Sequence, residues 1–173
     1  MTRGACLTIV AIFLGAVACL ASLEDVSLQD QYQGLALKYM PTVIHEGGTT
    51  YYPVDVCFDG DTVSANNRSS YDNMASSLGS AQRCWTYIHI LKDSESRLRH
   101  LYVQYWYYYV FNPFWTILDH DHDWELVLIV FDDVGTPIEV SVGAHGRLFT
   151  IDTTEVSWDA YTHPILYSAS GSH

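Results

Sequence analysis

The hydrophobic pattern changes once along this chain, from helical spacing to short extended runs. Leu28, Tyr32, Leu35 and Tyr39 recur at helical spacing, Ser27 and Asp30 resemble a capping box, and Pro41 stops the pattern. This predicts a short helix over 27–39. The chain then becomes rich in Val, Ile, Tyr, Phe and Trp, which favours strands. The predicted strands are Tyr51–Phe58, Cys84–Leu91, Leu101–Phe111, Trp124–Phe131, Ile138–Val142 and Ile165–Ser168.

Two of these strands are apolar on both faces. In Leu101–Phe111 both the odd and the even positions are mainly aromatic or aliphatic, and every residue of Leu126–Phe131 is apolar. Such strands are covered on both sides, which indicates the centre of a sandwich. A buried parallel sheet is the alternative, but alternating helices are missing. The turn-forming segment Asp132–Pro137 predicts an antiparallel hairpin.

The first 21 residues have the pattern of a targeting segment. Arg3 precedes the uncharged run Ala5–Ala21, which ends in small residues and is followed by Glu24 and Asp25. This pattern predicts a signal peptide over 1–21 and a secreted or extracytoplasmic protein. An uncleaved membrane anchor is the alternative, since the run is near the lower limit of a membrane span. Residues 22–173 then form a single β-sandwich domain, with no internal repeat.

Composition narrows the function classes. The net charge of −12 argues against nucleic acid as a partner, because phosphates require a basic surface. Cys57 and Cys84 are the two cysteines of the mature domain. In an exported chain they most simply form a disulfide, with two free thiols as the alternative.

The most distinctive segment runs from His120 to Glu125 and carries two imidazoles and three carboxylates before a core strand. Such charge density is costly beside a core unless a cation offsets it. On an extended chain Asp123 and Glu125 share one face, and a bend before Asp123 would bring His120 to them.

We therefore predict a divalent-metal site at His120, Asp123 and Glu125, with Asp121 and His122 as additional candidates. Oxygen ligands favour Ca²⁺ or Mg²⁺, with Mn²⁺ also possible, and adding histidine opens Zn²⁺ or Fe²⁺. An exposed acidic loop is the alternative.

Known hydrolase motifs do not fit. The zinc pattern H-x-H-x-D-H requires an aspartate where Trp124 stands, and neither H-E-x-x-H nor G-x-S-x-G occurs. No catalytic residue can be assigned from the sequence.

The segment from His120 to Glu125 resembles the G-H-R-H-D-W-E heptad of the necrosis-inducing protein family. It differs by Asp119 for the glycine and Asp121 for the arginine. The resemblance implies a β-sandwich whose cleft holds a divalent cation through His120, Asp123 and Glu125 and binds sphingolipid head groups. The family also has an acidic ligand upstream, for which Asn112 and Asp119 are candidates.

A second resemblance is spread over more of the chain. The segments Tyr39–Val43, Tyr51–Asp55, Tyr105–Tyr109 and Pro164–His173 resemble the vacuolar protein sorting 62-like family, which shares the Asp-Trp-Glu core. That family implies no defined activity. Because the last segment stops within what resembles a motif, we expect a C-terminally truncated sequence.

These features together predict an exported, divalent-cation-binding β-sandwich that binds a surface glycan or lipid head group, with cytolysin-like activity as a narrower version. A metal-dependent hydrolase using Asp123 and Glu125 is the alternative, and a structural ion is a third hypothesis.

Overall fold

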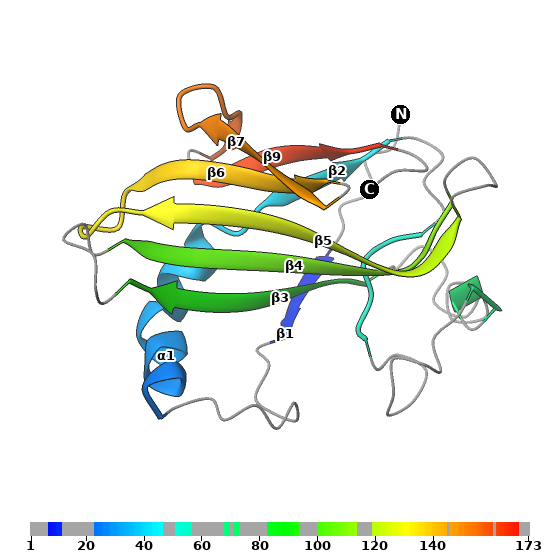
Figure 1. The fold of residues 1–173 in the computed structure, drawn as a ribbon, viewed down its shortest axis with the longest axis horizontal. Helices are drawn as coiled ribbons and strands as arrows, with labels where there is room; N and C mark the ends of the chain where they lie inside the picture. The colour runs from blue at the N-terminus through cyan, green and yellow to red at the C-terminus, as the bar shows by residue number, and fades with distance from the viewer. Residues whose placement is uncertain are drawn as a thin grey trace.

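The computed structural model shows the predicted β-sandwich, together with a 16-residue helix near the predicted position (Figure 1). The structure describes residues 7–11, 23–46, 51–56, 68–69, 71–72, 83–93, 100–113, 119–144, 146–160 and 162–169. Its elements are, in chain order, β1 (Leu7–Ala11), α1 (Leu23–Lys38), β2 (Thr42–His45), β3 (Arg83–Lys92), β4 (Leu101–Asn112), β5 (His120–Phe131), β6 (Pro137–Ala144), β7 (Arg147–Asp152), β8 (Trp158–Asp159) and β9 (His163–Ser168).

The large sheet has the order β1-β3-β4-β5-β6-β7, and the small sheet has the order β2-β9-β8. Pairing is antiparallel except where β1 joins β3 and β2 joins β9. The predicted hairpin joins β5 to β6. The Asp132 N–H donates to the Thr136 carbonyl at 3.0 Å, and Gly135 supplies the positive φ of 85° that the turn requires.

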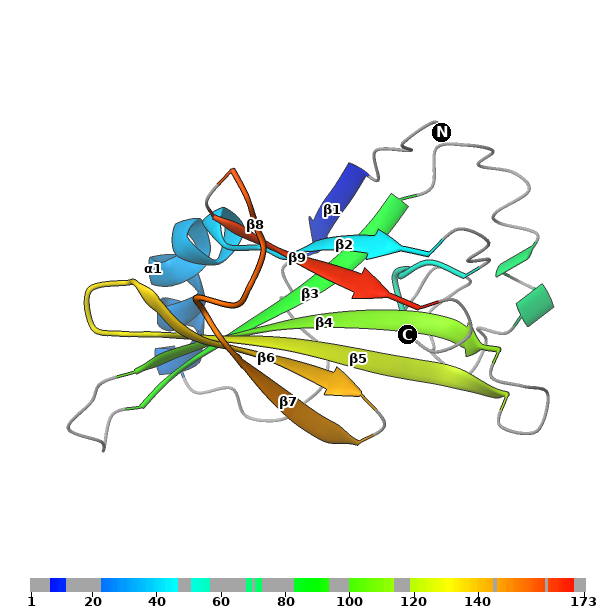
Figure 2. The same cartoon turned by 90° about the horizontal axis from the view of Figure 1, so that it is seen from above.

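Both faces of the central strands are covered, as their apolar pattern predicted. On one face Val103, Tyr105 and Ile129 pack against α1 and the small sheet. Figure 2 shows α1, β2 and β9 lying along this side of the large sheet. On the other face Tyr108 and Val110 pack against Val54, Val56 and Tyr71, among other residues.

Helix α1 is fixed to the large sheet by polar contacts as well as by its apolar side chains. The buried Tyr105 hydroxyl donates to the Ala36 carbonyl at 2.8 Å. Ala36 is in the last turn of the helix, where carbonyls lack an intrahelical partner. The Gln29 side-chain amide donates to the Ile90 carbonyl at 3.0 Å. The helix begins at Leu23, four residues before the predicted start.

The predicted strand Tyr51–Phe58 is wrong over its described part, because residues 51–56 form no strand. Pro53 has no N–H to donate to a ladder. The segment still runs beside the sheet: the Val54 N–H donates to the Tyr108 carbonyl, and the Trp85 N–H donates to the Pro53 carbonyl. Strands β1, β2, β7 and β8 were not predicted, and β5 begins at His120 rather than at Trp124.

The N-terminal and cysteine predictions remain largely untested. Residues 7–11, within the predicted signal peptide, form β1 against β3. Among the described residues, no helix combines the length and apolar character that a membrane crossing requires. Cys57 and the side chain of Cys84 lie outside the described residues, so their disulfide stays a prediction.

Candidate metal and glycan site

The polar N-terminal half of β5 pairs with the C-terminal half of β4, which is rich in aromatic residues. Register pairs Glu125 with Tyr107, Asp123 with Tyr109 and His120 with Asn112. Paired residues of antiparallel strands lie on the same face, so Glu125 and Asp123 point to the side that carries the small sheet. The acidic segment is therefore part of a paired strand rather than an exposed loop.

A local change of backbone brings His120 to Asp123. A regular strand would place these two residues on opposite faces. His122 has a φ of 63°, in the left-handed region that non-glycine residues seldom adopt. His120 Nε2 lies 3.5 Å from Asp123 Oδ1. The predicted approach of His120 to Asp123 is confirmed.

Asn112 completes the surroundings of Asp123. Its Nδ2 donates to Asp123 Oδ2 at 2.8 Å. The Asn112 side chain is only 4% exposed, and its Oδ1 atom has no hydrogen-bond partner among the described residues. A buried carbonyl oxygen without a partner is unfavourable, and a cation or a ligand hydroxyl would satisfy it. Of the two candidates for the upstream ligand, Asn112 is buried beside Asp123, whereas Asp119 is exposed.

Glu125 lies deeper along the same face. Burial and, to a smaller extent, the nearby Asp123 carboxylate together raise the pKa of its carboxyl group from 4.5 to about 8, while His120 opposes the shift. A neighbouring carboxylate in a partly desolvated site disfavours ionisation of Glu125. A divalent cation between them would reverse this effect by stabilising both anions.

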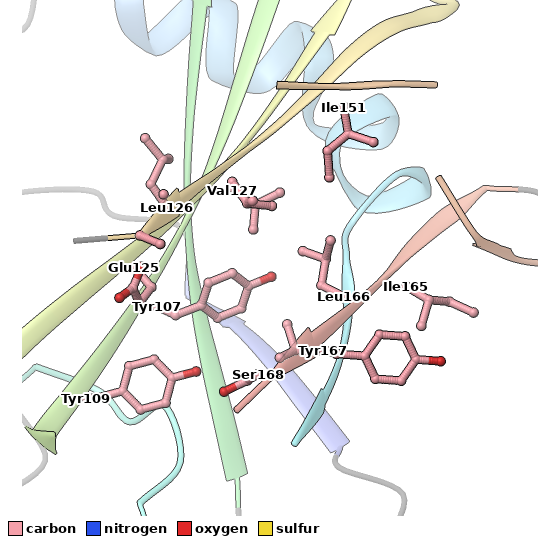
Figure 3. A pocket seen from close by; sticks show the side chains of 14 residues that line it. Tyr107, Tyr109, Glu125, Leu126, Val127, Ile151, Ile165, Leu166, Tyr167 and Ser168 are labelled. Carbon is pink, nitrogen blue, oxygen red and sulfur yellow. The ribbon is translucent and has the colours of Figure 1, made fainter. Parts of the chain in front are cut away.

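Two cavities meet at Glu125. The first, which we call the acidic cavity, has a volume of about 460 Å³, and its lining includes Trp106, Asn112, His120, Asp123, Trp124 and Glu125. The second, which we call the inter-sheet cleft, has a volume of about 410 Å³ and lies between β5 and β9. Figure 3 shows Glu125 at one end of this cleft, with Tyr107, Val127 and Leu166 further in. Both volumes are in the range of small-ligand sites.

The two additional candidates are not part of this arrangement. Asp121 is exposed, and His122 Nδ1 lies 2.7 Å from the Tyr108 hydroxyl on the opposite face. Within the described residues, no three His, Cys, Asp or Glu side chains are grouped as a metal ion would require. His120, Asp123 and Glu125 are among these described residues, so the three predicted ligands are not grouped around a common point in this structure. The Asn112 amide oxygen is a further oxygen donor beside Asp123.

The residues that sequence reasoning missed at this site are Trp106, Arg147 and Leu148, which also line the acidic cavity. Arg147 and Leu148 belong to β7, a strand that the apolar pattern did not predict. The pairing of Ala144 with Arg147 places this part of β7 beside the end of β6.

The architecture is that of a β-sandwich for which solved structures of similar fold exist. The solved structures that match include necrosis and ethylene-inducing proteins, abbreviated NLP. The structure described as a toxin fold for microbial attack and plant defense is 17% identical, covers 83% of this chain and 64% of its own, and has a TM-score of 0.56. NLPPya in complex with mannosamine is 17% identical and has a TM-score of 0.53. The match covers 81% of this chain and 62% of NLPPya.

A third match, the non-toxic HaNLP3 protein, is 13% identical and has a TM-score of 0.52. The match covers 79% of this chain and 62% of HaNLP3. This chain therefore spans less than two thirds of the length of these proteins. No protein-family model and no curated protein matches the chain. The matches support the resemblance to the necrosis-inducing proteins at the level of the fold, and they give no support to the vacuolar protein sorting 62-like resemblance.

Proposed function

We propose that this protein binds one divalent cation through Asn112, His120, Asp123 and Glu125, and that the bound cation holds the hydroxyl groups of a surface glycan or lipid head group. The observation that carries this proposal is the buried Asn112 side chain. One end of its amide orients Asp123 at 2.8 Å, while Oδ1 has no hydrogen-bond partner among the described residues. An amide oxygen held beside two carboxylates is a hard donor set.

Calcium and magnesium fit this donor set best, since three of the four residues offer oxygen. The His120 imidazole also admits manganese or zinc. Burial and the Asp123 carboxylate make the ionised form of Glu125 unfavourable, which raises its pKa. A bound cation would stabilise the ionised form, so the raised pKa supports a cation site.

The glycan part of the proposal is supported by the fold neighbours. NLPPya has been solved in complex with mannosamine and with glucosamine. The narrower, cytolysin-like version has less support. Asp119 and Asp121 replace the glycine and arginine of the heptad, and a non-toxic protein shares the fold.

The experiment is a calorimetric titration of the purified protein with Ca²⁺, Mg²⁺ and Mn²⁺. We expect one binding site that is lost in Asp123→Asn and weakened in Asn112→Leu. The matched control is Asp133→Asn, an exposed aspartate in the β5–β6 turn, which should bind like the parent. Equal binding by Asp123→Asn and the parent would exclude this site.

A metal-dependent hydrolase using Asp123 and Glu125 is the second candidate, in which one carboxylate would act as general base while the cation would polarise a carbonyl or phosphoryl oxygen. In that case Glu125→Gln would retain folding and lose turnover of a glycoside or ester substrate that the parent hydrolyses. A parent without turnover that nevertheless binds the sugar favours the binding function.

The proposed site of action is outside the cell. The support is the uncharged segment Ala5–Ala21 after Arg3. N-terminal sequencing of the protein secreted by an expression host tests this directly: a mature N-terminus near Ser22 is expected, whereas an intact Met1 in a membrane fraction would indicate an anchor.

A further inference from the structure

The inter-sheet cleft has apolar walls and a polar end, and it shares only Glu125 with the proposed cation ligands. Aliphatic side chains from both sheets form the walls, namely Val43, Val127, Val142, Ile151, Ile165 and Leu166. Figure 3 shows the Tyr107 side chain entering the cleft from β4 with its hydroxyl group toward Leu166, and Ser168 at the lower end. An apolar cavity with a few convergent polar groups is typical of a small-molecule site.

The hydroxyl group of Tyr107 is an unused hydrogen-bond donor inside this cleft. Tyr107 is 5% exposed, and its hydroxyl has no hydrogen-bond partner among the described residues. Burial raises the pKa of this hydroxyl well above its ordinary value; Thr86 opposes the shift, although no contact of the hydroxyl has the geometry of a hydrogen bond. The group therefore stays protonated. A buried donor without a partner is unfavourable, and a ligand oxygen would satisfy it.

Tyr105 shows the same side chain with its hydrogen bond made. It lies two residues away on the same face of β4 and is fully buried, and its hydroxyl donates to the Ala36 carbonyl at 2.8 Å. Tyr105 is not among the residues that line the cleft. Of these two tyrosines, only Tyr107 therefore presents an unused donor to a cavity.

Ser168 supplies a second polar group to the cleft. It is 8% exposed, and no contact of its Oγ atom with the described residues has the geometry of a hydrogen bond. A serine hydroxyl can donate or accept, whereas a protonated tyrosine buried beside apolar walls chiefly offers its proton. The two groups together suit a ligand oxygen that accepts one hydrogen bond and donates another, which is the property of an alcohol.

The charges around the cleft restrict the head group further. Among the described residues that line it there is no Lys, Arg or His, and Glu125 is the one acidic side chain. An anionic head group would therefore lack a counter-ion, and an ammonium group has no lone pair to accept the Tyr107 proton. The volume of about 410 Å³ holds roughly a dozen water-sized groups at about 30 Å³ each, so an aliphatic chain of medium length fits.

We infer that the inter-sheet cleft binds an uncharged aliphatic alcohol, whose chain lies between the two sheets and whose hydroxyl group accepts a hydrogen bond from Tyr107 and donates one to Ser168. This site goes beyond the proposed function, because it uses neither a cation nor the side chains of Asn112, His120 and Asp123.

The test measures the binding of octanol, octanoate and octylamine to the full chain by calorimetry. These probes share one chain length and differ in the head group. Each titration is made in a chelator and again with calcium and magnesium. The proteins are the parent, Tyr107→Phe and the matched control Tyr105→Phe, which removes a hydroxyl from the same strand and face but outside the cleft lining. Urea unfolding of all three proteins accompanies the titrations.

We expect the parent to bind octanol at one site, equally in both buffers, and to bind octanoate and octylamine at least tenfold more weakly. Tyr107→Phe should weaken octanol binding by roughly three- to tenfold, the effect of one hydrogen bond, while Tyr105→Phe should bind like the parent. Tyr107→Phe should also unfold at the same urea concentration as the parent or at a higher one, because it removes an unused buried donor.

Equal octanol binding by Tyr107→Phe and the parent, or the same loss in Tyr105→Phe, would overturn the inference. So would a parent that binds no octanol or that prefers octanoate or octylamine, results that need no variant to fold. Octanol binding that requires calcium or magnesium would also overturn it, because the head group would then be held at the cation. None of these outcomes decides whether the cation itself binds, so the two proposals can fail separately.

Discussion

Replacing Glu125 by glutamine should change how the stability of the metal-free protein depends on pH. In the folded protein the Glu125 pKa is raised from 4.5 to about 8, chiefly by burial and then by Asp123. Between these two values the folded state keeps a proton that the unfolded state has released. Stability contributed by the protonated group is therefore full below about pH 4.5 and is lost as the pH rises toward 8.

The size of this effect follows from the shift. Each pKa unit corresponds to about 1.4 kcal/mol, and partial exposure of Glu125 to solvent reduces the total, so we expect a loss of roughly 2–3 kcal/mol of unfolding free energy. Glutamine cannot ionise, so the Glu125→Gln variant should not show this loss. Between pH 4.5 and pH 8 its unfolding free energy should fall by roughly 2–3 kcal/mol less than that of the parent.

The assay is urea unfolding in a chelator, followed by tryptophan fluorescence at intervals from pH 4.5 to pH 8.5. Glu155→Gln is the matched control, because Glu155 is an exposed carboxylate in the turn after β7, and its profile should follow that of the parent. Parallel profiles of the parent and Glu125→Gln would refute the reasoning, since they would mean that Glu125 ionises freely in the folded protein.

Three further predictions concern single features. Tyr105→Phe should lower the unfolding free energy by about 1–3 kcal/mol in urea, because the buried Ala36 carbonyl loses its donor; an unchanged midpoint would mean that water replaces the hydroxyl. Gly135→Ala should destabilise the protein by about 1 kcal/mol, because the φ of 85° at this position disfavours a Cβ atom, and Gly135→Asn should destabilise it less. Equal melting temperatures of the parent, Gly135→Ala and Gly135→Asn would count against the assigned turn. Adding excess Ca²⁺ or Mg²⁺ should raise the melting temperature of the parent, while Asp123→Asn should not respond, as mass action requires; an equal rise in both would show that the ion binds elsewhere.

Much of the fold could be predicted from the spacing of apolar residues. The strand with two apolar faces, Leu101–Phe111, became the centre of the large sheet, and Pro41 marked the end of the helix region. Strand β7 was missed because its exposed Leu148 and Phe149 neither alternate nor form a buried run. The segment 51–56 was misassigned because its buried Tyr51, Val54 and Val56 resemble strand residues, although they contact the sheet from a non-strand conformation.

The candidate site was predictable in residue type but not in geometry. The run from His120 to Glu125 stands out in the sequence because of its charged residues, and the alternation of side chains along a strand places Asp123 and Glu125 on one face. Nothing in the sequence shows that His122 adopts a positive φ, which depends on tertiary context. The contact of Asn112 with Asp123 could not be predicted without the register between β4 and β5, because the two residues are 11 positions apart and strand pairing brings them together.

The measurement that tests the central claim most directly is elemental analysis of the purified protein after dialysis against calcium and magnesium, beside the double variant Asp123→Asn/Glu125→Gln. We expect one equivalent of divalent metal in the parent and none in the folded variant. No bound metal in the parent, or the same amount in both proteins, would contradict a cation site in the acidic cavity.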